Sequence, residues 1–372
     1  MTDSAPDALP DGAPTTVPTS PADGGGSGRR RAKPPRRARR ALRIALLVFA
    51  LLVAGSAAGV WWVWQDLSSN LSSVDLDKAI GDNRPPKVAA NARNVLVLGS
   101  DSRGGANGEL DTAGATTVSG ARSDTAMLVH LPASGGKATA VSIPRDTLVE
   151  RPACPDRDGG ELPPAHRVMF NSLYSDGGSA CVVKTVETMS GIRVDHLLEV
   201  DFAGFKELVD ALGGVTVTLD KPMSGAKGSL KLDAGTHRLD GTQALRFVRT
   251  RYGYGDGSDL GRIGLQQTFL MAVLAEVRKQ DALGDPARLY KLADAGTKAL
   301  TTDSGLSSLP ALAEFARSLQ GVDPARMETL TLPVAADRID PNRVVPEQDR
   351  ADALWQALRD DVPVPAALKK QP

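Results

Sequence analysis

The fold is decided by the stretch Asn94-Val95-Leu96-Val97-Leu98-Gly99-Ser100-Asp101. Its apolar run is stopped by a glycine and a carboxylate, a pattern typical of a buried strand that ends at a functional site. Working outward, the apolar pattern recurs at residues 126–131 and 138–143, and again at 196–200 and 215–219. We therefore expect a sheet built around residues 94–101.

Helical patterns alternate with these strands. Between residues 202 and 212 one helix face carries Phe202, Phe205, Leu208, Val209 and Leu212, and Gly213-Gly214 end the helix. Further helices are expected at 182–190, 262–279, 286–300, 307–320 and 349–359, with one strand near 329–334. Strands alternating with helices predict an α/β layered domain.

The first 64 residues form a different kind of segment. Residues 1–43 are rich in proline and glycine and carry nine Lys or Arg against four Asp, which predicts a disordered basic tail. Residues 44–64 have no charge; as a helix they would span about 31 Å, the thickness of a hydrocarbon core. Trp61, Trp62 and Trp64 close this run at the level expected for the headgroups.

Two alternatives to a membrane anchor fit this segment less well. A cleaved signal peptide has a shorter apolar core and a small-residue cleavage site, and a nucleic-acid arm would not need an adjacent spanning run. The basic flank predicts a cytoplasmic N-terminus, so the rest of the chain is expected outside the cell membrane. Residues 65–92 are then a partly helical stalk. After residue 43 the chain carries 35 basic and 40 acidic groups, which argues against nucleic-acid binding.

The two cysteines are Cys154 and Cys181. An oxidising exterior permits a disulfide between them, which would tether a loop-rich segment. The alternative is a pair of free buried thiols.

The usual catalytic motifs are missing. The chain has no GxxxxGK[ST], no GxGxxG after a strand, no HExxH and no GxSxG, and its four histidines have no ligand spacing. Arginine and aspartate instead stand at the ends of expected elements, as in Ser100-Asp101-Ser102-Arg103, Arg122-Ser123-Asp124 and Pro144-Arg145-Asp146.

The spacing near residue 260 indicates an anion site. Asp259, Arg262 and Gln266 share one face at the start of a helix, where free N–H groups favour anions. Arg249 and Arg251 are two apart and would lie on one side of an extended strand. Converging guanidinium groups match phosphate oxygens, and the carboxylates could hold a divalent cation. Ordinary surface ion pairing is the alternative.

These residues resemble the LytR-CpsA-Psr family of cell-wall glycopolymer ligases, in its actinobacterial style, over residues 93–300. The matching blocks are 95–103, 122–128, 142–147, 170–174 with Gly177-Gly178, 200–215, 249–251, 259–262 and Gln266-Gln267. The resemblance implies an αβα sandwich around a central mixed sheet in residues 93–300, preceded by the one transmembrane helix, with a mostly helical extension over 301–372.

The resemblance also implies the site. Diphosphate binding would fall to Arg103, Arg122, Arg145, Arg249, Arg251, Arg262 and Gln266. Asp101 and Asp259 would hold Mg²⁺ (or Mn²⁺), with Asp124 supporting the cluster, and the catalytic group would be Asp101, Arg122, Asp124, Arg145 and Arg251. The chain departs from the family at Leu265, where an arginine usually precedes the Gln-Gln pair.

The implied reaction moves a glycopolymer from a polyprenyl-diphosphate carrier onto the muramic-acid 6-hydroxyl of peptidoglycan, leaving polyprenyl phosphate. The apolar face of 202–212 would be core or would line a groove for the lipid. A lipid-diphosphate hydrolase with the same site and a non-catalytic wall-binding protein remain as alternatives.

Overall fold

The computed structural model describes residues 36–81, 83–87, 91–100, 123–135, 137–224, 230–250, 259–279 and 285–369. The chain forms two compact units, and the boundary between them follows Val60. The side chains of Asp124 and Asp259 are outside the description, although their backbones are within it.

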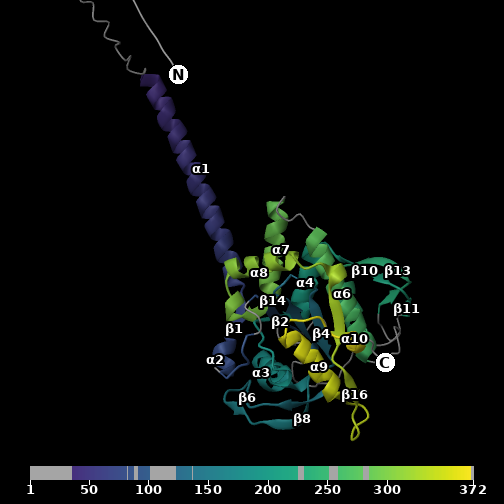
Figure 1. The fold of residues 1–372 in the computed structure, drawn as a ribbon. Coiled ribbons are helices and arrows are strands. Elements are labelled where there is room, and N and C mark those ends of the chain that lie inside the picture. The colour runs from purple at the N-terminus through teal and green to yellow at the C-terminus, as the bar shows by residue number, and fades with distance from the viewer. Residues whose placement is uncertain are drawn as a thin grey trace, which may run out of the picture. The chain divides into compact units, whose positions relative to one another are not determined.

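A single long helix, α1 (Arg36–Ser69), leads the described chain (Figure 1). Its part from Arg43 to Ser69 contains an 18-residue stretch with a mean hydropathy of 2.3 and is long and apolar enough to cross a membrane. Trp61, Trp62 and Trp64 are exposed by 66%, 58% and 50%. The helix continues past the expected end at residue 64, so the start of the expected stalk belongs to the same helix.

The second unit is built on a seven-stranded sheet in the order β1-β14-β9-β2-β3-β4-β15. Neighbours β1 and β14, β9 and β2, and β4 and β15 are parallel, and the other neighbouring pairs are antiparallel. The strands are β1 (Ser72–Val74), β2 (Arg93–Ser100), β3 (Ser123–Leu131), β4 (Thr139–Ile143), β9 (His196–Asp201), β14 (Leu300–Asp303) and β15 (Glu328–Thr331). The predicted α/β fold with a central mixed sheet is confirmed.

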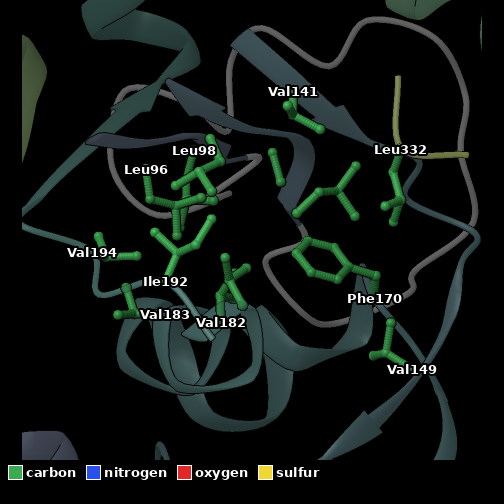
Figure 2. Close-up of a cluster of buried hydrophobic side chains, with 14 of the residues drawn as sticks. Leu96, Leu98, Val141, Val149, Phe170, Val182, Val183, Ile192, Val194 and Leu332 are labelled. Carbon is green, nitrogen blue, oxygen red and sulfur yellow. The ribbon is translucent and has the colours of Figure 1, made fainter. Parts of the chain in front are cut away.

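Helices cover both faces of this sheet. Because side chains alternate along a strand, Leu96 and Leu98 of β2 face one layer while Val95 and Val97 face the other. The first layer comprises α2 (Leu76–Ile80), α3 (Ser172–Ser190) and α9 (Gln348–Arg359), and Figure 2 shows Val182 and Val183 of α3 pointing toward Leu96 and Leu98. The second layer comprises α6 (Asp259–Lys279) and α8 (Leu309–Gln320).

A smaller apolar cluster lies beside α6. It joins α4 (Phe202–Ala211), α5 (Gly241–Arg249) and α7 (Pro286–Ala299) to the two-stranded sheet of β10 (Val215–Leu219) and β13 (Gly235–Leu239). The remaining elements are β5 (Leu148–Arg151), β6 (Cys154–Pro155), β7 (Glu161–Leu162), β8 (Ala165–Met169), β11 (Met223–Ser224), β12 (Lys231–Leu232), η4 (Ser304–Leu306), η5 (Pro324–Arg326), β16 (Val334–Ala336), β17 (Val344–Pro346) and α10 (Ala366–Lys369).

The structure differs from the sequence expectations at the sheet margins. The expected stalk contributes β1, and β14 forms where the mostly helical extension was expected to begin. β15 confirms the strand expected near 329–334 and joins the same sheet. The expected helix 182–190 is the second part of α3, which bends where Gly177 and Gly178 leave helical geometry. A side chain at Gly177 would lie 2.3 Å from the Pro155 carbonyl oxygen, so the bend needs glycine there.

Candidate active site

The strands that lead into the predicted site segments end or begin at one edge of the sheet. β2 and β9 end there side by side, because Ser100 pairs with Asp201 in the parallel register. β3 begins at the same edge opposite Ser100, and β4 ends there, two residues before Arg145. The predicted site segments that follow β2 and β4 therefore start from one edge, at the carboxyl ends of parallel strands.

The first turns of α6 are fastened to this edge through two glutamines. The Gln266 side-chain amide donates to the Thr125 hydroxyl at 2.9 Å and to the Val248 carbonyl at 3.3 Å. The Gln267 amide donates to the Ser142 hydroxyl and the Leu330 carbonyl, both at 3.0 Å. α6 is thereby tied to β3, β4, β15 and the end of α5. Arg262, one turn before Gln266, is only 3% exposed.

Arg249 reaches the edge from the end of α5. Its guanidinium carbon lies 4.5 Å from the centre of the Phe202 ring, at the first residue of α4. The expected strand through Arg249 is wrong, because the residue closes a helix that Asp240 and Gln243 begin with a capping box. Stacking on an aromatic face orients a guanidinium group while its N–H donors stay available.

Arg145 follows β4. Its Nε atom lies 3.5 Å from an Asp146 carboxylate oxygen, and its carbonyl accepts a hydrogen bond from the Asn171 backbone at 3.0 Å. The side chain is 19% exposed, so it reaches solvent while its backbone is fixed by the segment before α3.

A polar cluster on the α3 side of the edge was missed from the sequence. The Tyr174 hydroxyl donates a short hydrogen bond to Glu199 of β9, and it also interacts with Ser100 at the end of β2. Burial, the Glu199 charge and this hydrogen bond raise the pKa of Tyr174 to about 12, so the phenol keeps its proton. The Arg157 guanidinium lies 5.0 Å from the centre of the Tyr174 ring. The only signal in the sequence was a carboxylate inside an apolar strand.

Several predicted site residues fall outside the described part of the chain. Asp101, Arg103, Arg122 and Arg251 lie in undescribed segments, next to Ser100, Ser123 and Thr250. Asp124 is placed only by its backbone in β3, and Asp259 only as the first residue of α6. Among the described residues, Arg145, Arg249, Arg262 and Gln266 stand on segments that end or begin at this edge.

The other sequence-level candidates have structural surroundings. Leu265 is 2% exposed and packs in the cluster that includes Phe247 and Phe269, where an arginine would be buried. Val209 and Leu212 of the apolar stripe belong to the same cluster, so these two are core. Cys154 and Cys181 are joined by a disulfide.

The arrangement suits a polyanion. Three arginines come from the end of β4, the end of α5 and the first turns of α6, and the N-terminus of α6 starts at the same edge. Within the described ranges, no group of three His, Cys, Asp or Glu side chains gathers to hold a metal ion.

Comparison with known proteins gives consistent matches. The model of the LytR_cpsA_psr family matches residues 63–360. The cell wall biosynthesis protein LcpA of Corynebacterium glutamicum is 34% identical over 285 residues, which are 67% of this chain and 51% of that protein. The Bacillus subtilis polyisoprenyl-teichoic acid–peptidoglycan teichoic acid transferase TagT is 32% identical over 75% of this chain and 81% of its own.

A solved LytR-Csp2A-Psr enzyme from Actinomyces oris superposes with a TM-score of 0.55 at 25% identity, covering 77% of this chain and 95% of that one. The chain spans about half the length of the Corynebacterium relative.

Proposed function

Because the chain belongs to the LytR_cpsA_psr family, we propose that it is a membrane-anchored phosphotransferase that attaches a glycopolymer to peptidoglycan. The donor is a polyprenyl-diphosphate-linked glycopolymer, of the teichoic-acid or arabinogalactan type. The muramic-acid 6-hydroxyl attacks the phosphorus next to the sugar, a phosphodiester forms, and polyprenyl phosphate leaves. The observation that supports this proposal is that Arg145, Arg249, Arg262 and Gln266 stand on segments that end or begin at one sheet edge.

The arginines would bind and position the diphosphate. Phosphoryl transfer depends on positioning and charge neutralisation more than on a covalent nucleophile. We assign diphosphate contacts to Arg145, Arg249 and Arg262 with Gln266, and extend the set to Arg103, Arg122 and Arg251. Asp124 would support Arg122. The membrane anchor would hold the enzyme in the same bilayer as a lipid-linked donor, with the body outside the cell.

Mg²⁺ (or Mn²⁺) is part of the proposal. Position 101 directly follows the end of β2, and position 259 begins a helix whose Gln266 bonds to Thr125 on the neighbouring β3. Asp101 is next in sequence to Ser100, which ends β2 at this edge, and this supports the proposal that Asp101 and Asp259 hold the cation together. A bound Mg²⁺ would neutralise charge on the diphosphate.

The deciding experiment separates transfer from hydrolysis. Full-length protein in detergent is incubated with a polyprenyl-diphosphate glycopolymer, with and without peptidoglycan oligomers. Release of polyprenyl phosphate that requires peptidoglycan, together with polymer-bearing peptidoglycan, is the expected result. Release that proceeds equally without acceptor identifies a hydrolase instead, and binding to peptidoglycan without turnover identifies a wall-binding protein.

A matched pair of arginines on α5 tests the site. Arg249→Ala should lower transfer at least about tenfold, equivalent to about 1.4 kcal/mol of lost transition-state binding. Arg246→Ala is the control, because Arg246 is also an exposed arginine in the last turn of α5. Equal activity of the two variants would show that Arg249 does not contribute to diphosphate binding.

A further inference from the structure

The last turns of α1 lie against α7 (Figure 1). The Tyr290 hydroxyl donates to Asp66 at 2.7 Å, and the Asn70 side-chain amide donates to Asp294 at 3.1 Å. Both pairs are separated by the same 224 residues, so the two helices run in the same direction at this contact. The register places Arg288 level with Trp64, and Leu289 level with Gln65.

The burial of α1 supports this register. Val63 and Asp66 are half-buried and Leu67 is 8% exposed, at the spacing of one helix face. Trp62 and Trp64, on either side of Val63, remain exposed. The folded domain therefore covers one face of α1 as far as the level of the tryptophans, the side chains that prefer the headgroup layer of a bilayer.

The exposed start of α7 has the chemistry of a lipid-contacting surface. Arg288 and Lys291 are exposed and, three residues apart, share one face of α7; Leu289, on an adjoining face of the same turn, is 42% exposed. Among the described residues, neither cation forms an ion pair with a carboxylate. Asp285, three residues before Arg288, caps α7 through its side chain.

We propose that Arg288, Leu289 and Lys291 form a membrane contact in the leaflet that Trp61, Trp62 and Trp64 mark. The two cations would bind phosphodiesters of anionic phospholipids, and Leu289 would enter the boundary with the acyl chains. This surface is separate from the diphosphate edge and does not depend on the transfer reaction; it requires only that α1 spans the bilayer.

A depth measurement tests the proposal directly. Both native cysteines are in a disulfide, so Leu289→Cys supplies one reactive thiol for an environment-sensitive fluorophore. In lipid nanodiscs of phosphatidylglycerol, the label at 289 should shift to the blue and be quenched by headgroup spin-labelled lipid. Ile339→Cys is the control, because Ile339 is 78% exposed between β16 and β17. Water-like, unquenched emission at both positions would overturn the proposal.

The charge requirement is tested with the same label. Arg288→Glu/Lys291→Glu should reduce headgroup quenching at position 289 about twofold or more in phosphatidylglycerol nanodiscs, because each basic residue is attracted to an anionic surface. Lys231→Glu/Arg338→Glu reverses two other exposed cations and should change nothing. Thermal melting of each variant verifies folding. If quenching is the same in phosphatidylcholine as in phosphatidylglycerol, and the Arg288/Lys291 reversal has no effect, the assigned lipid chemistry is wrong.

Discussion

At the scale of single residues, the hydrogen bond from Tyr174 to Glu199 joins α3 to β9. Tyr174→Phe would leave the part-buried Glu199 carboxylate without its donor, and we expect a loss of about 1–3 kcal/mol in unfolding free energy. Tyr174→Phe/Glu199→Leu removes both polar partners and should recover part of that loss. Chemical denaturation measures all three proteins. A double variant no more stable than Tyr174→Phe would contradict this account.

Asp303 gives the domain a defined response to acid. Burial would raise the pKa of this carboxyl, but hydrogen bonds from His196 and from the Leu197 and Gly305 backbones, with the charge of His196, lower it below its ordinary value of 3.8. Since the pKa is lower in the folded state, this contribution to stability is present above pH 3.8 and is lost as the pH falls through the folded value.

We therefore expect Asp303→Asn to be less stable than the parent at pH 7 and to lose less stability on acidification. Melting temperatures measured from pH 7 down to pH 3 provide the comparison. A variant curve parallel to that of the parent would show that Asp303 does not carry the acid response.

At the scale of elements, the packing of α4 on α7 depends on Gly204. A side chain there would come within 2.5 Å of the Ala299 Cα atom, so Gly204→Ala must push the helices apart. We expect it to destabilise the domain by about 1–3 kcal/mol. Gly296→Ala, on α7 with open space around it, should instead stabilise by up to about 1 kcal/mol. Opposite signs in thermal melting are expected, and destabilisation by both changes would refute the difference.

The sequence predicted the central strands well and the marginal ones poorly. The central strands are buried on both faces of the sheet, so their sequences are almost continuous apolar runs that are easy to recognise. These strands are β2, β3, β4 and β9. β1 reads Ser72-Ser73-Val74, and its pairing with Thr301 and Thr302 of β14 is a tertiary effect that local pattern does not carry.

The candidate site was also predicted in part. The position of Arg145 at the sheet edge was predictable because this residue follows the apolar strand β4. The helix at Arg249 was signalled by the Asp240 and Gln243 capping pair, which the alternating Arg249-Thr250-Arg251 pattern outweighed. The contact between Tyr174 and Glu199 depends on which face of α3 covers β9, and this is decided only when the layers assemble.

At the scale of the whole molecule, the disulfide is a test of compartment as well as of stability. It closes a separation of 27 residues, for which chain entropy predicts about 3–4 kcal/mol of stabilisation. Cys154→Ser/Cys181→Ser should melt at a lower temperature, and the parent should show no titratable thiol before reduction. Two reactive thiols in protein isolated from the cell envelope would contradict an oxidising, external location.

The short connection between α1 and the sheet would limit how the proposed enzyme meets its substrates. Only Asn70 and Leu71 separate the end of α1 from β1, and β1 is already paired to β14. If α1 crosses the membrane and the chain acts as proposed, no long flexible linker would let the domain move away from the bilayer. The lipid-linked donor would then reach it by lateral diffusion in the membrane, and the acceptor would be wall polymer that lies close to the membrane. Such a protein would modify the newest, innermost layer of the wall.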